Sequence, residues 1–354
     1  VLKHAPHVDV VFGTHNIHEL PALLEAAEAG RPAVSVLEQG EAFASDLPQV
    51  REHPWHAWVS ITVGCDNHCA YCIVPSVRGA ERSRPAEDIV AEVARLVEDG
   101  VLEITLLGQN VNSYGRDRYG EPRFAALLRQ VADTGVRRIR FATSHPKDLS
   151  DDTIAALAEL PAMMPFLHLP VQHGSNQILE AMNRRYTRES YLERIAAVRE
   201  RTPDIALSTD IIVGFPGESE EDFAQTLDLI QRVRFDHAFT FIYSKRDGTP
   251  AAALADTVPR EVAQERFDRL ALLVRDLSYA ANEREVGLVR PCLIEGASRR
   301  DASVLSARTP HNRLVHVTLG PREAAATFQG SVRDILITAA HPWFLTGEFA
   351  QPGR

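Results

Sequence analysis

The sequence has only four cysteines in 354 residues, too few for a disulfide framework. Three of them, Cys65, Cys69 and Cys72, fall within eight positions, and Cys292 lies far away. This distribution favours a ligand cluster in a reducing compartment, so we expect a cytoplasmic protein. The sequence also lacks any apolar run near the ~20 residues that a membrane span requires, which argues against a membrane protein.

The net charge is negative but unevenly distributed. A value of −10 for the whole chain argues against a protein that coats nucleic acid without selection. Residues 284–354 nevertheless carry nine Lys and Arg against six Asp and Glu, a balance of +3. We therefore expect this tail, rather than the acidic remainder, to contact a polyanion.

The beginning of the chain is loosely patterned. It starts at Val1 in the middle of a pattern, so we expect it to be part of a longer polypeptide. Residues 7–13 predict a short buried strand, and residues 19–29 predict a helix. The prolines and mixed polarity of residues 30–54 predict a linker.

The middle of the chain alternates short apolar runs with longer stretches of helical periodicity. The expected strands are 57–63, 103–107, 139–143, 166–169, 206–213 and 237–243. The expected helices are 86–99, 123–134, 150–160, 175–201 with an interruption, 219–233 and 259–285. Ser219 and Asp222 form a candidate capping box for the fifth of these helices. Six β-then-α units predict a parallel sheet, either open and doubly wound or closed into a barrel of fewer than eight units.

Unusual polar motifs follow these strands. Both architectures place functional residues at the carboxyl ends of the strands, so we expect the site there. The motifs are Gly64-Cys65, Gly108-Gln109-Asn110, Thr143-Ser144-His145, Gln172-His173-Gly174, Gly214-Phe215-Pro216-Gly217 and Ser244-Lys245-Arg246.

The cysteines stand in a C-x3-C-x2-C spacing on one expected loop. Three thiolates leave one iron of a four-iron cluster without a protein ligand, and a substrate can chelate that iron. The amino and carboxylate groups of S-adenosylmethionine suit this position. The alternative is a zinc site with His68 as the fourth ligand, and the spacing alone leaves both open.

At this loop the chain resembles the radical S-adenosylmethionine superfamily, whose signature is C-x3-C-x-aromatic-C. Tyr71 fills the aromatic position, which in that superfamily lies against the adenine. The resemblance implies an α/β fold with a partial six-unit (β/α) barrel. It also implies a [4Fe-4S] cluster on Cys65, Cys69 and Cys72 that cleaves S-adenosylmethionine to a radical.

Over nearly its whole length the chain resembles the methylthiotransferases of that superfamily. The matching stretches are Ile73 to Pro75, Arg78-Gly79, Ser83-Arg84-Pro85, Leu107 to Gly115, Thr143 to Pro146, Leu167 to Ser175, Ile212 to Glu218 and Ser244 to Pro250. They are most similar to the branch that acts on isopentenylated adenosine at tRNA position 37. Sister branches, which modify threonylcarbamoyl-adenosine in tRNA or an aspartate of a ribosomal protein, are the alternative. An alternative of another class is a zinc-stabilised RNA-binding module without catalysis.

The resemblance also implies cofactor-binding residues. Gly108, Gln109 and Asn110 occupy a strand end at which related enzymes bind the methionine amino group, and Gln109 is the best candidate among them. Ser144, Gln172 and Asp210 are candidates for contacts with the carboxylate or ribose. Gly214 and Gly217 suit a close approach of the backbone to the adenine side. A structural role is the alternative for each, because buried amides and carboxylates often satisfy local backbone.

His145, His168 and His173 are candidate bases, with neutral core histidines as the commoner alternative.

From residue 284 the sequence changes to short β-type runs at 290–295, 303–307, 314–319, 330–338 and 343–348. These runs predict a small five-stranded barrel, with Cys292 packed in one strand. Leu293 to Gly296 and Arg308 to Arg313 resemble TRAM, a tRNA-binding barrel. Arg299, Arg300, Arg308 and Arg313 are then candidates for contacts with anticodon-stem phosphates, and Arg78 and Arg84 for contacts with the target nucleoside. Surface solvation or ion pairing is the alternative for all six.

The resulting organisation has three parts: a remnant of the N-terminal methylthiotransferase domain with a linker at 1–50, a radical core at 51–283, and TRAM at 284–350. The family carries a second [4Fe-4S] cluster on three cysteines of the N-terminal domain, whereas this sequence has no cysteine before Cys65. We therefore expect the chain as given to bind one cluster and to cleave S-adenosylmethionine without inserting sulfur. The resemblance also implies a tRNA anticodon stem-loop as partner, flavodoxin or ferredoxin as electron donor, and a monomer.

Overall fold

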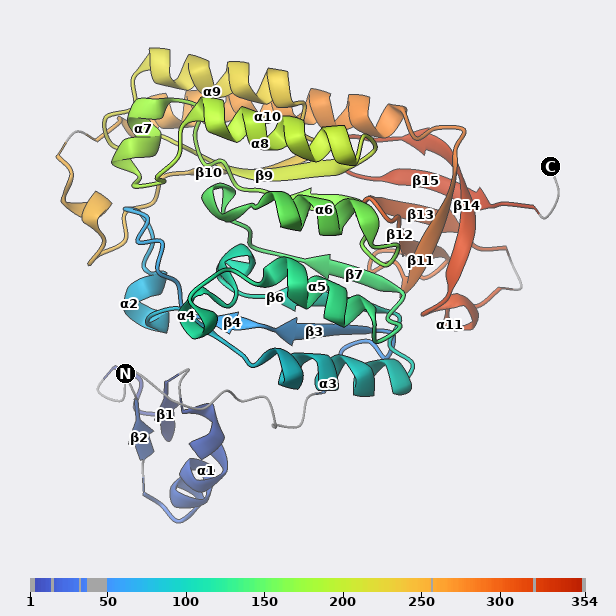
Figure 1. Ribbon diagram of the computed structural model, residues 1–354, viewed down its shortest axis with the longest axis horizontal. Coiled ribbons are helices and arrows are strands. Elements are labelled where there is room, and N and C mark those ends of the chain that lie inside the picture. Colours follow the sequence, from blue (N-terminus) through green and yellow to red (C-terminus); the bar gives the residue numbers. More distant parts are fainter. Residues whose placement is uncertain are drawn as a thin grey trace.

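The computed structural model describes residues 4–13, 16–31, 33–36, 50–255, 257–320 and 323–351. Figure 1 shows three parts: a small N-terminal unit, a large α/β body and a small C-terminal β-barrel. In the N-terminal unit, β1 (Val10–Phe12) pairs in parallel with β2 (Ala33–Ser35), and α1 (Leu20–Glu28) connects them. The strand β2 lies in the stretch predicted as a linker, and residues 37–49 of that stretch lie outside the described residues.

Six parallel strands form the α/β body, in two groups of three. One group has the order β3 (His56–Ser60), β6 (Glu103–Leu107) and β7 (Arg138–Phe141), and the other has the order β8 (Phe166–His168), β9 (Ala206–Val213) and β10 (His237–Ile242). An isolated parallel bridge between Ile139 and Met163 connects the two groups. The six strands therefore form a curved, partial barrel with β3 and β10 as its edges, and the open doubly wound alternative is wrong.

Helices cover the outer face of this curved sheet, as Figure 1 shows for α3 and α5 on one side and α8, α9 and α10 on the other. Apolar side chains from both layers, including Ile104, Ile139, Leu128 and Val93, form one buried core. The helices of the body are α2 (Val74–Arg78), α3 (Ala86–Glu98), α4 (Arg116–Tyr119), α5 (Phe124–Ala132), α6 (Asp151–Glu159), α7 (Asn176–Ala181), α8 (Arg188–Arg201), α9 (Glu220–Val233) and α10 (Arg260–Glu283).

The first expected strand, 57–63, is divided in the structure. After β3, Ile61 still bonds to Leu107, but β4 (Thr62–Val63) then pairs antiparallel with β5 (Arg82–Ser83). The chain leaves the main sheet here because β5, which returns from the cysteine loop, offers a second ladder. The short β4–β5 ladder thus closes the base of the loop that carries the cysteines.

The C-terminal strands form the third part, a closed barrel in the order β11 (Val289–Ala297), β12 (Val304–Arg308), β13 (Leu314–Thr318), β15 (Leu345–Phe349) and β14 (Val332–Ala340). A short helix, α11 (Ala325–Phe328), lies between β13 and β14 in the chain. Cys292 is fully buried in the apolar interior with Ile294, Leu305 and Ile335. The five-stranded barrel and the packing role of Cys292 are confirmed.

A buried charge cluster fixes this barrel to the amino ends of the strands of the body (Figure 1). Glu103 accepts hydrogen bonds from Arg138 Nε at 2.7 Å and from Arg140 Nε at 3.0 Å. Arg140 also donates to the carbonyls of Thr309 and Pro310 in the β12–β13 loop. Burial alone would raise the pKa of Glu103, but the two guanidinium groups hold it below its usual value. The arginines therefore satisfy a carboxylate of the body and backbone of the barrel at once.

Among the described residues, every helix is too short or too polar to cross a membrane.

Candidate functional site

The cysteine loop follows β4 at the carboxyl ends of the strands. Gly64 has a φ of +75°, and a Cβ there would lie 2.0 Å from the carbonyl oxygen of Ala80, so only glycine fits. Backbone hydrogen bonds hold the loop: Cys65 N donates to Gly79, Ala70 N to Met182, and Ala251 N to Ala70. Segments from three other parts of the chain therefore fix the loop that presents Cys65, Cys69 and Cys72.

The three thiols suit a multi-iron group. Cys69 is buried, and Cys65 and Cys72 are partly buried. Burial raises the pKa of Cys65 to about 11 and also raises the pKa of Cys72, so the free thiols stay protonated unless a positive metal offsets the desolvation. The three cysteines lie on one loop, and in a four-iron cluster each sulfur binds a different iron, so they fit such a cluster.

Arg184, a residue that sequence reasoning missed, lies against the cysteine loop. Its Nη1 lies 3.4 Å from the sulfur of Cys69 and 3.3 Å from the hydroxyl of Tyr71, and its Nη2 donates to the carbonyl of Pro170 at 2.8 Å. The side chain is only 4% exposed, so its charge acts on the sulfur with little solvent between them. No local pattern around Arg184 signals this role, because the fold alone brings it to the loop from 115 residues away.

Tyr71 packs against a small apolar cluster that includes Phe215, Met182 and Ala251. Its hydroxyl faces Arg184, and burial raises its pKa well above the usual value. The side chain therefore connects the cysteine loop to the loop after β9. Its contact with an adenine stays a prediction.

The strand end after β6 combines an exposed and a buried amide. Gln109 is exposed, whereas Asn110 is 1% exposed and donates to Asp148 at 2.7 Å. A Cβ on Gly108 would lie 2.1 Å from the hydroxyl of Thr62, so this strand end packs directly on β4. The ligand roles of these residues stay predictions, and the side chain of Asn110 binds the described part of the protein through its amino group, which leaves Oδ1 without a partner there.

Several buried polar atoms at the carboxyl ends have no hydrogen-bond partner in the described part of the chain. They include Asn110 Oδ1, Ser144 Oγ and the hydroxyl of Tyr243. An unpaired buried polar atom costs about 1–3 kcal/mol, so such atoms commonly mark a missing ligand or water. Their position beside the three thiols fits a polar cofactor such as S-adenosylmethionine.

Gln172 and Asp210 lie on neighbouring strands. Gln172 has a φ of +72° and makes a parallel bridge with Ile211, through hydrogen bonds that involve its own backbone. The carboxylate of Asp210 lies 3.6 Å from His168 Nε2. The backbone of Gln172 is therefore structural, and both side chains stay candidates for cofactor contact.

Gly214 packs closely against α10. A Cβ there would lie 2.7 Å from the Cβ of Ala263, so helix packing alone requires the glycine, and its approach to the adenine side stays a prediction. Gly217 has a φ of +84° in a turn closed by a hydrogen bond from Glu218 N to Phe215 O. Both glycines thus shape the loop after β9.

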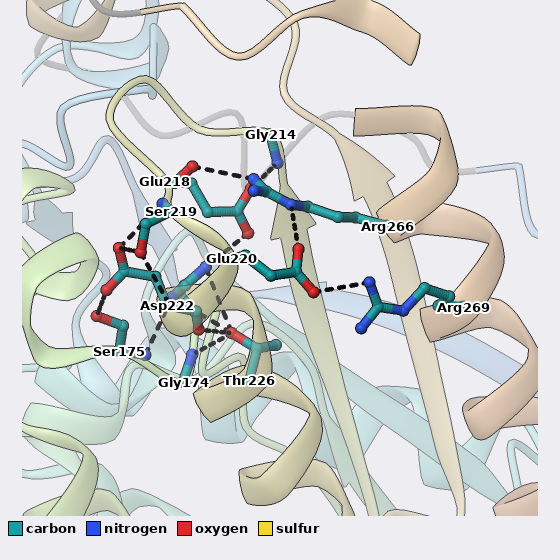
Figure 2. Close-up of polar contacts among 11 residues, drawn as sticks. Gly174, Ser175, Gly214, Glu218, Ser219, Glu220, Asp222, Thr226, Arg266 and Arg269 are labelled. Atoms are coloured by element: carbon teal, nitrogen blue, oxygen red, sulfur yellow. Dashed lines mark hydrogen bonds and ion pairs between the residues drawn. The ribbon is translucent and has the colours of Figure 1, made fainter. Parts of the chain in front are cut away.

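A buried carboxylate holds that loop, as Figure 2 shows. Glu218 accepts hydrogen bonds from Gly214 N at 2.5 Å and from Arg266 Nη1 at 3.0 Å, and His173 Nε2 lies 3.0 Å from its other oxygen. His173 Nδ1 accepts from Ser175 N, so Nε2 carries the proton and donates to Glu218. Glu218, which sequence reasoning also missed, therefore connects the loops after β8 and β9 to α10.

The beginning of α9 completes this network (Figure 2). Ser219 and Asp222 form a reciprocal capping box, which confirms that prediction. Asp222 also accepts a hydrogen bond from Ser175, and Thr226 accepts one from Gly174 N at 2.9 Å. These side chains thus position the loops after β8 and β9.

Two of the three histidines at the strand ends are buried. Burial lowers the pKa of His145 to about 2, with Arg184 and Lys147 adding to the shift, so this imidazole stays neutral. His173 is fully buried against Glu218, whereas His168 is partly exposed and bonds to Ser208 at 2.8 Å. The neutral-core alternative is therefore favoured for His145, a structural role for His173, and His168 stays a candidate base.

An acidic group lies beside the cysteine loop. Glu81 is 7% exposed, and its backbone N donates to Asp66 Oδ1 at 3.0 Å. Burial, together with the nearby Asp66, Asp117 and Asp148, raises the pKa of Glu81 to about 7, although a hydrogen bond with Ser113 opposes the shift. The carboxyl therefore titrates near neutrality.

Three of the six arginines proposed for RNA contact are used inside the protein. Arg84 is 4% exposed and is paired with Glu92 at 2.8 Å, so it is not available to RNA. Arg308 makes two hydrogen bonds to Glu295, and Arg313 binds Asp236 and Asn282 of the body. Burial therefore argues against an RNA contact for Arg84, whereas RNA contacts of Arg308 and Arg313 stay predictions although both side chains are paired with carboxylates. Arg78, Arg299 and Arg300 are exposed and remain candidates.

Comparison with known proteins gives consistent results. Residues 59–230 match the family model described as the Radical SAM superfamily. The chain is 50% identical over 353 residues to the tRNA-2-methylthio-N(6)-dimethylallyladenosine synthase of Acidothermus cellulolyticus, covering 98% of this chain and 70% of that protein. The protein of the same name from Streptomyces coelicolor is 50% identical over 99% of this chain and 70% of its own length. That from Thermoanaerobacter pseudethanolicus is 49% identical over 98% of this chain and 73% of its own length.

Solved structures give more distant matches. The radical S-adenosylmethionine methyltransferase TsrM from Kitasatospora setae aligns with a TM-score of 0.47 and 18% identity, over 55% of this chain and 38% of that one. Coproporphyrinogen III oxidase (HemN) from Escherichia coli aligns with a TM-score of 0.41 and 15% identity, over 62% of this chain and 57% of that one.

Proposed function

This chain belongs to the family of tRNA-2-methylthio-N(6)-dimethylallyladenosine synthases, and we propose on that premise that it generates the radical for the addition of a methylthio group to N6-isopentenyladenosine at tRNA position 37. The second cluster that takes part in sulfur donation needs cysteines that this sequence does not have before Cys65. It is a radical S-adenosylmethionine enzyme that uses a [4Fe-4S] cluster. The observation that carries the proposal is about 50% identity over almost the whole chain to synthases of this one name. This identity favours the isopentenyladenosine branch over its sister branches.

We propose that Cys65, Cys69 and Cys72 hold the cluster and that Arg184 positions Cys69 and Tyr71 beside it. The bound cluster and S-adenosylmethionine supply a 5′-deoxyadenosyl radical, which suits a carbon–hydrogen bond too inert for a side-chain base. Asn110 Oδ1 and Ser144 Oγ are our candidates for cofactor contacts, since both are buried without a partner in the described part of the chain. Gln109, Gln172 and Asp210 are further candidates at neighbouring strand ends.

We propose that the RNA partner contacts both the radical core and the small C-terminal barrel. Our proposed division places a remnant domain and linker at 1–50, the radical core at 51–283 and a TRAM barrel at 284–350. The end of α10 at Glu283 and the beginning of β11 at Val289 support the second boundary. We propose an anticodon stem-loop as the bound element, with Arg78, Arg299 and Arg300 as phosphate contacts. A flavodoxin or ferredoxin donor, a monomer and a cytoplasmic location complete the proposal.

Nucleoside analysis of tRNA tests this function. Deleting the gene that encodes this chain should remove 2-methylthio-N6-isopentenyladenosine from total tRNA and leave N6-isopentenyladenosine in its place. Unchanged methylthio-isopentenyladenosine would contradict the proposal. Loss of the methylthiolated threonylcarbamoyl nucleoside instead would assign the chain to a sister branch.

A further inference from the structure

A cavity of about 260 Å³ lies where the body meets the small barrel. Its walls come from the amino ends of β8, β9 and β10 on one side and from the β12–β13 loop and residues 342–344 on the other. The cavity is smaller than the ~300–1,000 Å³ usual for drug-sized ligands, so it suits one planar ring system rather than a whole cofactor. It lies at the opposite ends of the strands from the cysteine loop and is therefore separate from the cluster site.

Aromatic rings with exposed faces line this cavity. Phe239 is 48% exposed and Trp343 is 52% exposed, although both are large apolar residues. The ring of His237 lies between them, 4.6 Å from Phe239 and 5.7 Å from Trp343, edge-on to both. Phe239 also meets the ring of His168 edge-on at 6.0 Å, whereas Trp343 has no other ring contact among the described residues. Base–aromatic stacking on an exposed ring contributes about 1–3 kcal/mol per base.

The charged groups around the cavity are already paired. Arg313 binds Asp236 and Asn282, and Arg308 binds Glu295 through two hydrogen bonds. A phosphate would have to break these pairs, whereas a neutral ring would not. The side-chain amide of Asn312, at a φ of +64°, makes no hydrogen bond within the described part of the chain. It offers a donor and an acceptor for the edge of a base.

The aromatic row continues toward the cluster site. Phe241 follows Phe239 on the same face of β10 and is 50% exposed, while Ala238 on the other face packs in the core. Beyond the strand, the buried hydroxyl of Tyr243 has no partner in the described residues. Because β10 and β3 are unpaired edges of the partial barrel, this row is open to a bulky substrate along its length.

We propose that this cavity binds an unpaired nucleobase of the RNA substrate, stacked on the exposed ring of Trp343 or Phe239 beside His237 and distinct from the adenosine that reacts. The inference rests on the proposed function, since it takes the partner to be RNA. The second base anchors the RNA at the junction of body and barrel while the target adenosine lies at the carboxyl ends of the strands.

Binding of a synthetic anticodon stem-loop RNA to the full chain, reconstituted anaerobically with iron and sulfide, tests the proposal. Trp343→Ala and Phe239→Ala should each weaken binding by about 5- to 150-fold, the range expected for loss of one base stack. Trp343→Phe should largely restore it, because stacking needs only an aromatic face. Tyr279→Ala is the matched control: Tyr279 is 41% exposed on α10, outside the cavity, and its removal should leave binding unchanged.

A second measurement identifies the bound group. Ultraviolet crosslinking and mass spectrometry should place one unpaired base of the loop, other than the target adenosine, on the peptide that contains Trp343. Equal RNA affinity of the wild-type chain and both alanine variants would overturn the cavity proposal and leave the methylthiotransferase function intact. A reconstituted chain that cleaves S-adenosylmethionine but binds no stem-loop would overturn both.

Discussion

At the carboxyl ends of the six strands, buried polar atoms such as Asn110 Oδ1 and Ser144 Oγ lack partners in the described part of the chain. At the amino ends, by contrast, the buried charges of Glu103, Arg138 and Arg140 are paired with one another and with the backbone of the small barrel. Unpaired atoms destabilise a protein unless a ligand satisfies them, whereas the paired cluster fixes two domains together. One end of the sheet is thus prepared for a cofactor, and the other for stability and for docking of the barrel.

The sharpest test of this division is removal of a thiol. Cys65→Ala, Cys69→Ala or Cys72→Ala should abolish loading of the cluster, because each thiolate binds its own iron. Iron analysis after anaerobic reconstitution should fall from about four irons per chain to near zero, with loss of the broad absorption near ~400 nm. Cys292→Ala is the control and should keep full iron content, since Cys292 packs in the small barrel. Full iron loading of all three loop variants would contradict the assignment.

At the amino ends of the strands, breaking the buried charge cluster should instead lower the stability of the protein. Glu103→Ala leaves Arg138 and Arg140 buried side by side without their carboxylate, which should lower the free energy of unfolding by about 3–5 kcal/mol. Urea denaturation measures this change. The matched variant Glu159→Ala breaks an exposed pair with Arg129 at 3.8 Å and should cost at most about 1 kcal/mol. Similar losses of unfolding free energy for the two variants would contradict the claim that the buried cluster stabilises the protein more than a surface ion pair does.

At the carboxyl ends of the strands, burial of Glu81 should make the free energy of unfolding depend on pH. Folded Glu81 keeps its proton up to about pH 7, whereas the unfolded residue loses it near 4.5, so native stability falls as pH rises through this window. Glu81→Gln should therefore raise the free energy of unfolding at pH 8 by up to about 3 kcal/mol and change it little below the window. Urea titrations of the cluster-free chain at both pH values measure the difference. The exposed Glu121→Gln serves as the control, and an equal effect of Glu81→Gln at both pH values would refute the shift.

The smallest effect concerns the network that shapes the loops after β8 and β9. Ser219→Ala removes the capping box of α9 and should lower stability by about 1 kcal/mol. Ser219→Asp keeps an acceptor at the cap and should recover most of the loss. Thermal unfolding of both variants measures it, and an unchanged transition for the alanine variant would mean that the cap contributes nothing.

The sequence predicted the elements of the body and barrel well, because their apolar periodicity reflects the same burial that the structure shows. It also located the cysteine loop, whose ligands are close together in the chain. It did not reveal Arg184 or Glu218, whose partners Cys69 and Arg266 are distant in sequence. For the same reason it did not reveal the carboxylate partners of Arg84, Arg308 and Arg313, since in a sequence an arginine that pairs with another element is indistinguishable from one that faces solvent. Contacts that depend on tertiary folding leave no local pattern.

The isolated bridge between Ile139 and Met163 has a mechanical consequence. Within the described part of the chain, two backbone hydrogen bonds, from Ile139 N to Ala162 O and from Met164 N to Ile139 O, join the ladders of the two groups of strands. The catalytic body is thus two half-shells that share one seam, each with a complete ladder of its own. Strain from a bulky substrate should concentrate at this seam, which allows the bore of the barrel to widen while the pairing within each half-shell stays intact.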